Sequence, residues 1–145
     1  MIRKAPTVLL AEDNPNDLEL AVHALRRGGL TGRIDVARDG AEAVDYLFCQ
    51  GAYADRDPAD EPTVILLDIK MPKLDGVQVL RRIRADPRTK HLPVVMLTSS
   101  AENRDLSACY EYGVNSYIVK PVDIDQFFAA IEQVGVYWLK LNRPR

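Results

Sequence analysis

The chain has 145 residues, a length typical of one domain built around a single hydrophobic core. Hydrophobic residues make up 47% and charged residues 28%, as in ordinary globular proteins, and the net charge of −2 argues against a basic nucleic-acid-binding surface. No segment approaches the roughly 20 apolar residues that cross a bilayer, and the N-terminal apolar stretch is too short for a secretory signal, so we expect a cytoplasmic protein without membrane or nucleic-acid partners.

The first quarter of the chain predicts a strand, a helix and a second strand. The run TVLLA (7–11) is apolar throughout, which is typical of a strand covered on both faces of a parallel sheet. A helix follows, with Asn14 as its N-cap and Pro15 at its first position, and the Gly28–Gly29 pair is expected to end it. The run RIDVA (33–37) predicts the second strand.

The middle of the chain predicts a loop, two strands and a helix between them. GAYADRDPADEP (51–62) carries glycine, two prolines and several acids, and it predicts a polar surface loop. TVILLD (63–68) and PVVML (93–97) predict buried strands. The intervening helix contains the basic run Arg81-Arg82-Ile83-Arg84, which we interpret as a solvated helix face.

The last third predicts a helix over 102–112, the strand SYIVK (116–120) and a long final helix. Asp123 and Gln126 form a capping-box pattern at the start of that helix. Apolar residues at alternating spacings of three and four extend it to about residue 141: Ile124, Phe127, Ile131, Val134, Trp138 and Leu141. Strands that alternate with helices imply right-handed crossovers and a doubly wound α/β sheet. We expect one domain over 1–145, with its core at about 7–135.

Chemically active residue types follow four of the five predicted strands. Glu12 and Asp13 follow the first strand, Asp68 ends the third, Thr98 follows the fourth and Lys120 ends the fifth. Each residue taken alone is most often a helix cap or a loop residue. In an open parallel sheet, however, ligands bind beyond the carboxyl ends of the strands. We therefore expect all five side chains to meet at one edge of the sheet.

That set of residues suits phosphoryl transfer. Three adjacent carboxylates repel one another and need a counter-charge, which Mg²⁺ supplies in sites made of oxygen ligands. Thr98 and Lys120 offer a hydrogen-bond donor and a positive charge to a transferring phosphoryl group. Asp68, at the centre, is the candidate nucleophile that would form an aspartyl-phosphate.

The motifs Glu12-Asp13, VILLDIKMPKLDG, MLTSS and YIVKP, in this order, resemble the receiver domain of two-component response regulators. The resemblance implies a flavodoxin-like (βα)5 fold whose five parallel strands lie in the order 2-1-3-4-5. It also implies that Asp68 accepts phosphate from a sensor histidine kinase. By the same resemblance, Glu12, Asp13, Asp68 and the backbone carbonyl of Lys70 bind Mg²⁺.

The resemblance further assigns the residues that respond to phosphorylation. Thr98 and Lys120 would contact the phosphoryl group, and Tyr117 would swing inward when Thr98 moves. The Lys120–Pro121 peptide bond would be cis, a form that proline makes accessible. One departure from the family is Lys70, which stands where many relatives carry a polar or hydrophobic residue.

Three features narrow the subtype: the EDNPND start, the loop at 51–62 and the final helix through VYWLKLNRP. Together they resemble the small stand-alone receivers that partner bacterial phytochromes, and a generic single-domain regulator is the alternative. The sequence ends soon after the final helix, so no output domain is expected.

A homodimer or partner surface is predicted on the last two helices and the fifth strand. Four apolar residues lie off the core stripe of the final helix: Phe128, Val136, Tyr137 and Leu139. The helix at 102–112 has little to bury besides Leu106, Cys109 and Tyr110.

Two other classes of function compete with the phosphorylation switch. A phosphorylation-independent adaptor would keep the fold and bind its partner constitutively. A small phosphohydrolase would need a second acid two residues after Asp68 as its general acid, and Lys70 stands there instead. We therefore expect no enzyme in the ordinary sense, only slow self-catalysed phosphate transfer and hydrolysis.

Overall fold

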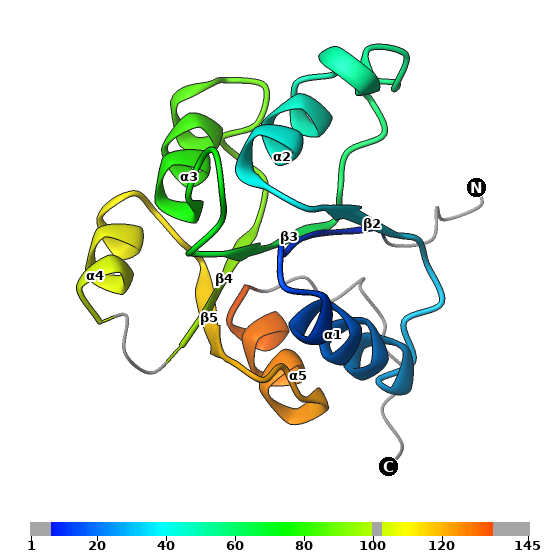
Figure 1. Cartoon of the computed structure of the whole chain (residues 1–145), viewed down its shortest axis with the longest axis vertical. Coiled ribbons are helices and arrows are strands. Elements are labelled where there is room, and N and C mark those ends of the chain that lie inside the picture. The colour runs from blue at the N-terminus through cyan, green and yellow to red at the C-terminus, as the bar shows by residue number, and fades with distance from the viewer. Residues whose placement is uncertain (1–6, 100–102, 135–145) are drawn as a thin grey trace.

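The computed structural model of the chain describes residues 7–99 and 103–134. One parallel five-stranded sheet lies at its centre in the order β2-β1-β3-β4-β5, with helices on both faces (Figure 1). The strands are β1 (Val8–Ala11), β2 (Ile34–Ala37), β3 (Val64–Asp68), β4 (Val94–Thr98) and β5 (Ser116–Val119). The helices are α1 (Pro15–Arg27), α2 (Gly40–Leu47), the 3-10 turn η1 (Gly51–Tyr53), α3 (Gly76–Ala85), α4 (Asn103–Glu111) and α5 (Ile124–Val134). The predicted fold class and strand order are confirmed.

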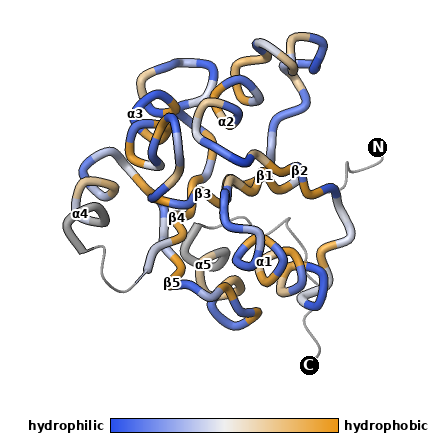
Figure 2. Tube along the Cα trace, viewed as in Figure 1, coloured by the Kyte–Doolittle hydropathy of each residue, from blue (hydrophilic) through white to orange (hydrophobic). Residues whose placement is uncertain are grey.

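The core is divided by the sheet into two apolar layers. Helices α1 and α5 cover one face, and Phe127 of α5 is fully buried there. Helices α2, α3 and α4 cover the other face, where Ile83 of α3 is fully buried. Every residue of β1, β3 and β4 is buried, which explains why these strands are apolar on both sides. In Figure 2 the hydrophobic colour accordingly gathers on the central strands.

The predicted signals at the ends of α1 are confirmed. The side chain of Asn14 accepts hydrogen bonds from the N–H groups of Asn16 and Asp17, and Pro15 is the first helical residue. Gly28 caps the carboxyl end, and Gly29 follows with φ of 94°, a conformation that glycine adopts without strain. This helix therefore begins directly beside the end of β1, at the edge where the site lies.

Two elements differ from the sequence prediction. No helix was predicted for residues 40–47 from their pattern, yet α2 forms there. Asp39 caps this helix by accepting a hydrogen bond from the Glu42 N–H. Only half of the expected capping box starts α5, because Asp123 accepts from the Gln126 N–H while the Gln126 amide oxygen accepts from Val119. The predicted extension of this helix to about residue 141 lies outside the described residues.

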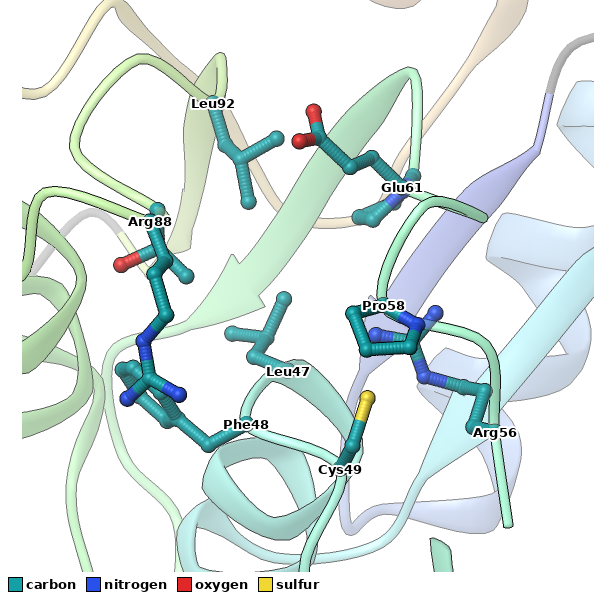
Figure 3. Close-up of a pocket in the computed structure, with 10 residues that line it drawn as sticks. Leu47, Phe48, Cys49, Arg56, Pro58, Glu61, Arg88 and Leu92 are labelled. Atoms are coloured by element: carbon teal, nitrogen blue, oxygen red, sulfur yellow. The ribbon is translucent and has the colours of Figure 1, made fainter. Parts of the chain in front are cut away.

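The loop at 51–62 is on the surface as predicted, and one arginine holds it against α2. Arg56 donates to the carbonyl oxygens of Tyr46 and Asp60, and its guanidinium lies 4.3 Å from the Tyr46 ring centroid. A cavity of about 60 Å³ separates the loop from the segment between α3 and β4, with Leu47 on its floor and Arg88 across from Pro58 (Figure 3). The two segments lead into β3 and β4, so the cavity lies toward the amino ends of these strands. Among the described helices, none is both long and apolar enough to span a membrane.

Candidate functional site

Three carboxylates converge at the carboxyl edge of the sheet. Glu12 and Asp13 follow β1, and Asp68 is the last residue of the neighbouring strand β3. One carboxylate oxygen from each residue lies within 4.8 Å of the other two. Glu12 and Asp68 are only 1% and 3% exposed, whereas Asp13 faces solvent. The structure thus brings together the three acids that the sequence placed at strand ends.

A close approach of α3 to β3 holds Asp68 in place. Gly76 is the first residue of α3, and its N–H donates to the carbonyl oxygen of Ile69 at 2.7 Å. A Cβ atom at this position would lie 2.3 Å from the Asp68 carbonyl oxygen, so only glycine lets the helix begin so near the strand. A full capping box between Asp75 and Gln78 fixes the start of α3. The sequence pair Asp75-Gly76 therefore helps to position the candidate nucleophile.

Lys120, directly after β5, contacts two of these acids and a further one. Its Nζ lies 2.9 Å from Asp68 Oδ2 and 2.8 Å from Glu12 Oε1. It also donates to Oδ2 of Asp17, in the first turn of α1, at 3.2 Å. The Lys120–Pro121 peptide bond is cis. Asp17 is not among the site residues predicted from the sequence, although an acid in the first turn of a helix that starts at this edge is a signal that could have found it.

Burial and charge together set the protonation of the site. Burial above all, and the neighbouring Asp68 carboxyl, raise the pKa of Glu12 to about 7, while the contact with Lys120 lowers it. Burial disfavours the charged form of Lys120, but its contacts with Glu12 and Asp68 outweigh this effect and raise its pKa above the ordinary value. The ammonium therefore stays charged at neutral pH, and Glu12 is poised between its two protonation states.

The donor atoms fit a hard divalent cation. Glu12 Oε2 accepts a hydrogen bond from the Asn14 N–H at 3.2 Å. Among residues 7–99 and 103–134, none forms a hydrogen bond with the buried Glu12 Oε1; Lys120 Nζ lies at ion-pair distance from it, 2.8 Å away. The Lys120 ammonium offsets part of the cost of burying this oxygen, and a bound metal ion would offset more of it. Carboxylates are the oxygen ligands that Mg²⁺ prefers. Lys70, whose carbonyl was expected to join them, lies beside Asp68 and donates its N–H to Asp68 Oδ1 at 3.3 Å.

The two residues predicted to form the switch lie on β4 and β5. Thr98 ends β4, where its buried hydroxyl donates to the Ser99 carbonyl oxygen at 2.9 Å. Tyr117 is 42% exposed, and its ring contacts that of Tyr110 on α4 edge to face, with 6.2 Å between the centroids. In this structure, therefore, the Tyr117 side chain faces outward and is braced by α4.

The predicted contact surface needs two corrections. Phe128 is only 8% exposed, because it faces α1, where a Cβ on Gly28 would lie 3.7 Å from its ring, so it belongs to the core. Tyr110, expected to be buried, is 53% exposed. Three other residues of the predicted surface (136, 137 and 139) and the Leu106 side chain lie outside what the structure describes.

Comparisons with known proteins agree on one family. A family model described as the response regulator receiver domain matches residues 8–132. In sequence, the probable methanogenesis regulatory protein FilR2 of Methanothrix harundinacea is 39% identical over 136 residues, which are 94% of this chain and 85% of that protein.

Solved structures extend this agreement to the whole fold. The bacteriophytochrome response regulator AtBRR is 50% identical and has a TM-score of 0.87, covering 97% of this chain and 100% of that chain. The Mn²⁺-bound form of response regulator Rcp1, a Synechocystis protein, is 33% identical with a TM-score of 0.75, covering 97% and 99% of the two chains. The chain therefore belongs to the response regulator receiver domain family.

Proposed function

We propose that the protein is a phosphorylation-driven switch in which Asp68 accepts a phosphoryl group from the phosphohistidine of a sensor kinase. The observation that carries this proposal is the Lys120 ammonium, 2.9 Å from Asp68 Oδ2 and beside the buried Glu12 carboxylate. An oxygen of Asp68 attacks the phosphorus, and the phosphorus–nitrogen bond of the kinase histidine breaks as the new oxygen–phosphorus bond forms. The histidine nitrogen that leaves takes a proton from solvent.

The residues around Asp68 have distinct parts in this transfer. Glu12 and Asp13, with the Asp68 carboxylate and the Lys70 carbonyl, would hold Mg²⁺. The bound cation supplies positive charge to the phosphoryl oxygens. The Mn²⁺-bound form of Rcp1 supports a cation in this family. Lys120 would pair with the phosphoryl group on Asp68, because its Nζ already contacts that carboxylate.

Residues at the end of β4 and on β5 respond to the charge of the phosphoryl group. A phosphoryl group on Asp68 adds negative charge and strong acceptor oxygens, which the Thr98 hydroxyl can reach by turning away from Ser99. Space that Thr98 leaves then favours an inward position of the Tyr117 ring, which changes the surface formed by α4 and β5. The only reactions expected of the protein are slow self-catalysed transfer of phosphate to Asp68 and its slow hydrolysis.

We further propose that the chain acts as a single-domain regulator whose kinase is a bacterial phytochrome. The likeness to AtBRR supports both points, because AtBRR is a bacteriophytochrome response regulator and its whole chain is covered. A mixture of the protein with such a kinase, under red and far-red light, should show light-dependent phosphate transfer. Equal transfer from unrelated kinases would remove the phytochrome assignment.

Self-association through α4 and β5 is a separate proposal, supported by the exposed ring pair of Tyr110 and Tyr117. Sedimentation at tens of micromolar, with and without phosphorylation, tests it. A monomer under both conditions would end this proposal and leave the switch intact.

The switch itself is tested by mass. The protein is mixed with Mg²⁺ and acetyl phosphate and weighed intact beside Asp68→Asn, with a parallel sample lacking Mg²⁺. One added phosphoryl group is expected only in the wild-type protein with Mg²⁺. No adduct under cold, brief exposure would contradict the switch and favour a phosphorylation-independent adaptor.

A further inference from the structure

One carboxylate at the site has no assigned part in the transfer. Asp17 accepts a hydrogen bond from Lys120 Nζ at 3.2 Å, and it lies outside the group of acids close enough to share a cation. Its backbone N–H donates to the Asn14 side chain, which holds this residue in the first turn of α1. The side chain is 33% exposed, whereas Glu12 and Asp68 are almost fully buried.

The Lys120 ammonium has three N–H donors and three carboxylates around it. When Mg²⁺ and a phosphoryl group bind, Glu12 and Asp68 acquire new partners. Asp17 lies outside the group of acids that could share the cation, so Lys120 remains its ion-pair partner. The incoming phosphoryl group must therefore share the ammonium with Asp17, and it approaches that carboxylate as a like charge.

We propose that Asp17 is a positioning residue that holds Lys120 in competition with the phosphoryl group and so limits the affinity of the site for it. This inference rests on the proposed function. Asp17 draws the ammonium toward α1 and solvent, which weakens its pairing with an anion at Asp68. Loss of the Asp17 charge should leave Lys120 to the phosphoryl group and make the phosphorylated form more favourable.

Beryllofluoride, which binds an aspartate with Mg²⁺ as a phosphoryl analogue, isolates this effect from the kinase. Its dissociation constant is measured by fluorine NMR in the wild-type protein and in Asp17→Asn. Because Asp17 is partly exposed, its charge is screened, and we expect binding about threefold tighter in the variant. Asp17→Glu keeps the charge and should restore the wild-type affinity. A merely structural role of Asp17 would weaken binding in Asp17→Asn.

The matched control is Glu19→Gln, which removes one exposed charge from the same helix without touching Lys120. It should leave the affinity unchanged, and thermal unfolding of all variants verifies that they fold. If the wild-type protein binds beryllofluoride and Asp17→Asn binds it equally or more weakly, the Asp17 inference is wrong and the proposed function stands. If the wild-type protein binds none, the proposed function itself fails.

Discussion

The two edges of the sheet are each organised by one partly buried cation, and the partners of the two cations differ. At the carboxyl edge, Lys120 is surrounded by the carboxylates of Glu12, Asp17 and Asp68. At the amino edge, Arg84 of α3 donates to the backbone carbonyls of Lys90, Leu92 and Gly113 and to the side chain of Asn115. These last four residues lie in the segments that lead into β4 and β5.

The chemistry of the partners gives the two cations different parts: Lys120 belongs to the proposed switch, and Arg84 stabilises the fold. Contacts with carboxylates raise the pKa of Lys120, whereas Arg84 has neutral partners and burial lowers its pKa. Carboxylates can be taken over by a metal ion or a phosphoryl group, so the contacts of Lys120 can be rearranged. The partners of Arg84 lie in the segments before β4 and β5, away from the acidic cluster, so no bound ligand competes for them and the contacts of Arg84 hold two loops in one arrangement.

The largest expected effect is a pH dependence of stability that arises at the carboxyl edge. The pKa of Glu12 rises from 4.5 in the unfolded chain to about 7 in the folded protein, so the folded state binds the proton more tightly. Its contribution to stability is therefore full below pH 4.5 and is lost as the pH rises through 7. At 1.36 kcal/mol per pKa unit the loss is about 3 kcal/mol.

Urea unfolding without Mg²⁺, between pH 5 and 8, measures this loss when wild type is compared with Glu12→Gln. The variant has no titrating group at this position, so its stability should fall less over the same range. Saturating Mg²⁺ should oppose the trend, because the metal needs the ionised carboxylate. Parallel curves for the two proteins would show that Glu12 does not titrate with a raised pKa.

At the amino edge, Arg84→Ala should lower the free energy of unfolding by about 2 kcal/mol, because it removes hydrogen bonds to partly buried carbonyls. Urea unfolding at pH 7 measures this loss. Arg82→Ala, on the exposed side of the same helix, is the matched control and should change stability by less than about 0.5 kcal/mol. Phosphorylation by acetyl phosphate should persist in both variants. A variant of Arg84 that folds normally but cannot be phosphorylated would contradict a purely structural role.

The same comparison explains what the sequence can and cannot predict. Glu12, Asp13, Asp68 and Lys120 could be placed together because strand order and direction decide where strand ends meet. Asp17 was missed because its place at the site depends on how α1 starts rather than on a strand end; the available signal was an acid in the first turn of that helix.

Arg84 was interpreted as part of a solvated helix face, and the structure corrects this. Three of its partners are backbone carbonyls in two distant loops, and backbone contacts cannot be seen in a pattern of side chains. The same limit applies to the loop at 51–62. Its polar composition predicted a surface loop, but the hydrogen bonds from Arg56 to backbone carbonyls could not be predicted. Helix α2 was missed because its 8 residues are too few for a clear helical repeat of apolar positions.

The smallest expected effect concerns the contact that keeps the switch residue outward. If phosphorylation rearranges the carboxyl edge, the contact of Tyr117 with Tyr110 must be weak enough for phosphorylation to break it. An edge-to-face ring pair such as Tyr110–Tyr117 contributes about 1 kcal/mol beyond its buried area. Tyr110→Leu should therefore favour the inward position of Tyr117 and tighten beryllofluoride binding by about fivefold, whereas Tyr110→Phe keeps the ring and should match wild type. Equal affinities for all three proteins would mean that the orientation of Tyr117 is not coupled to the site, and that the output surface is controlled from another part of the molecule.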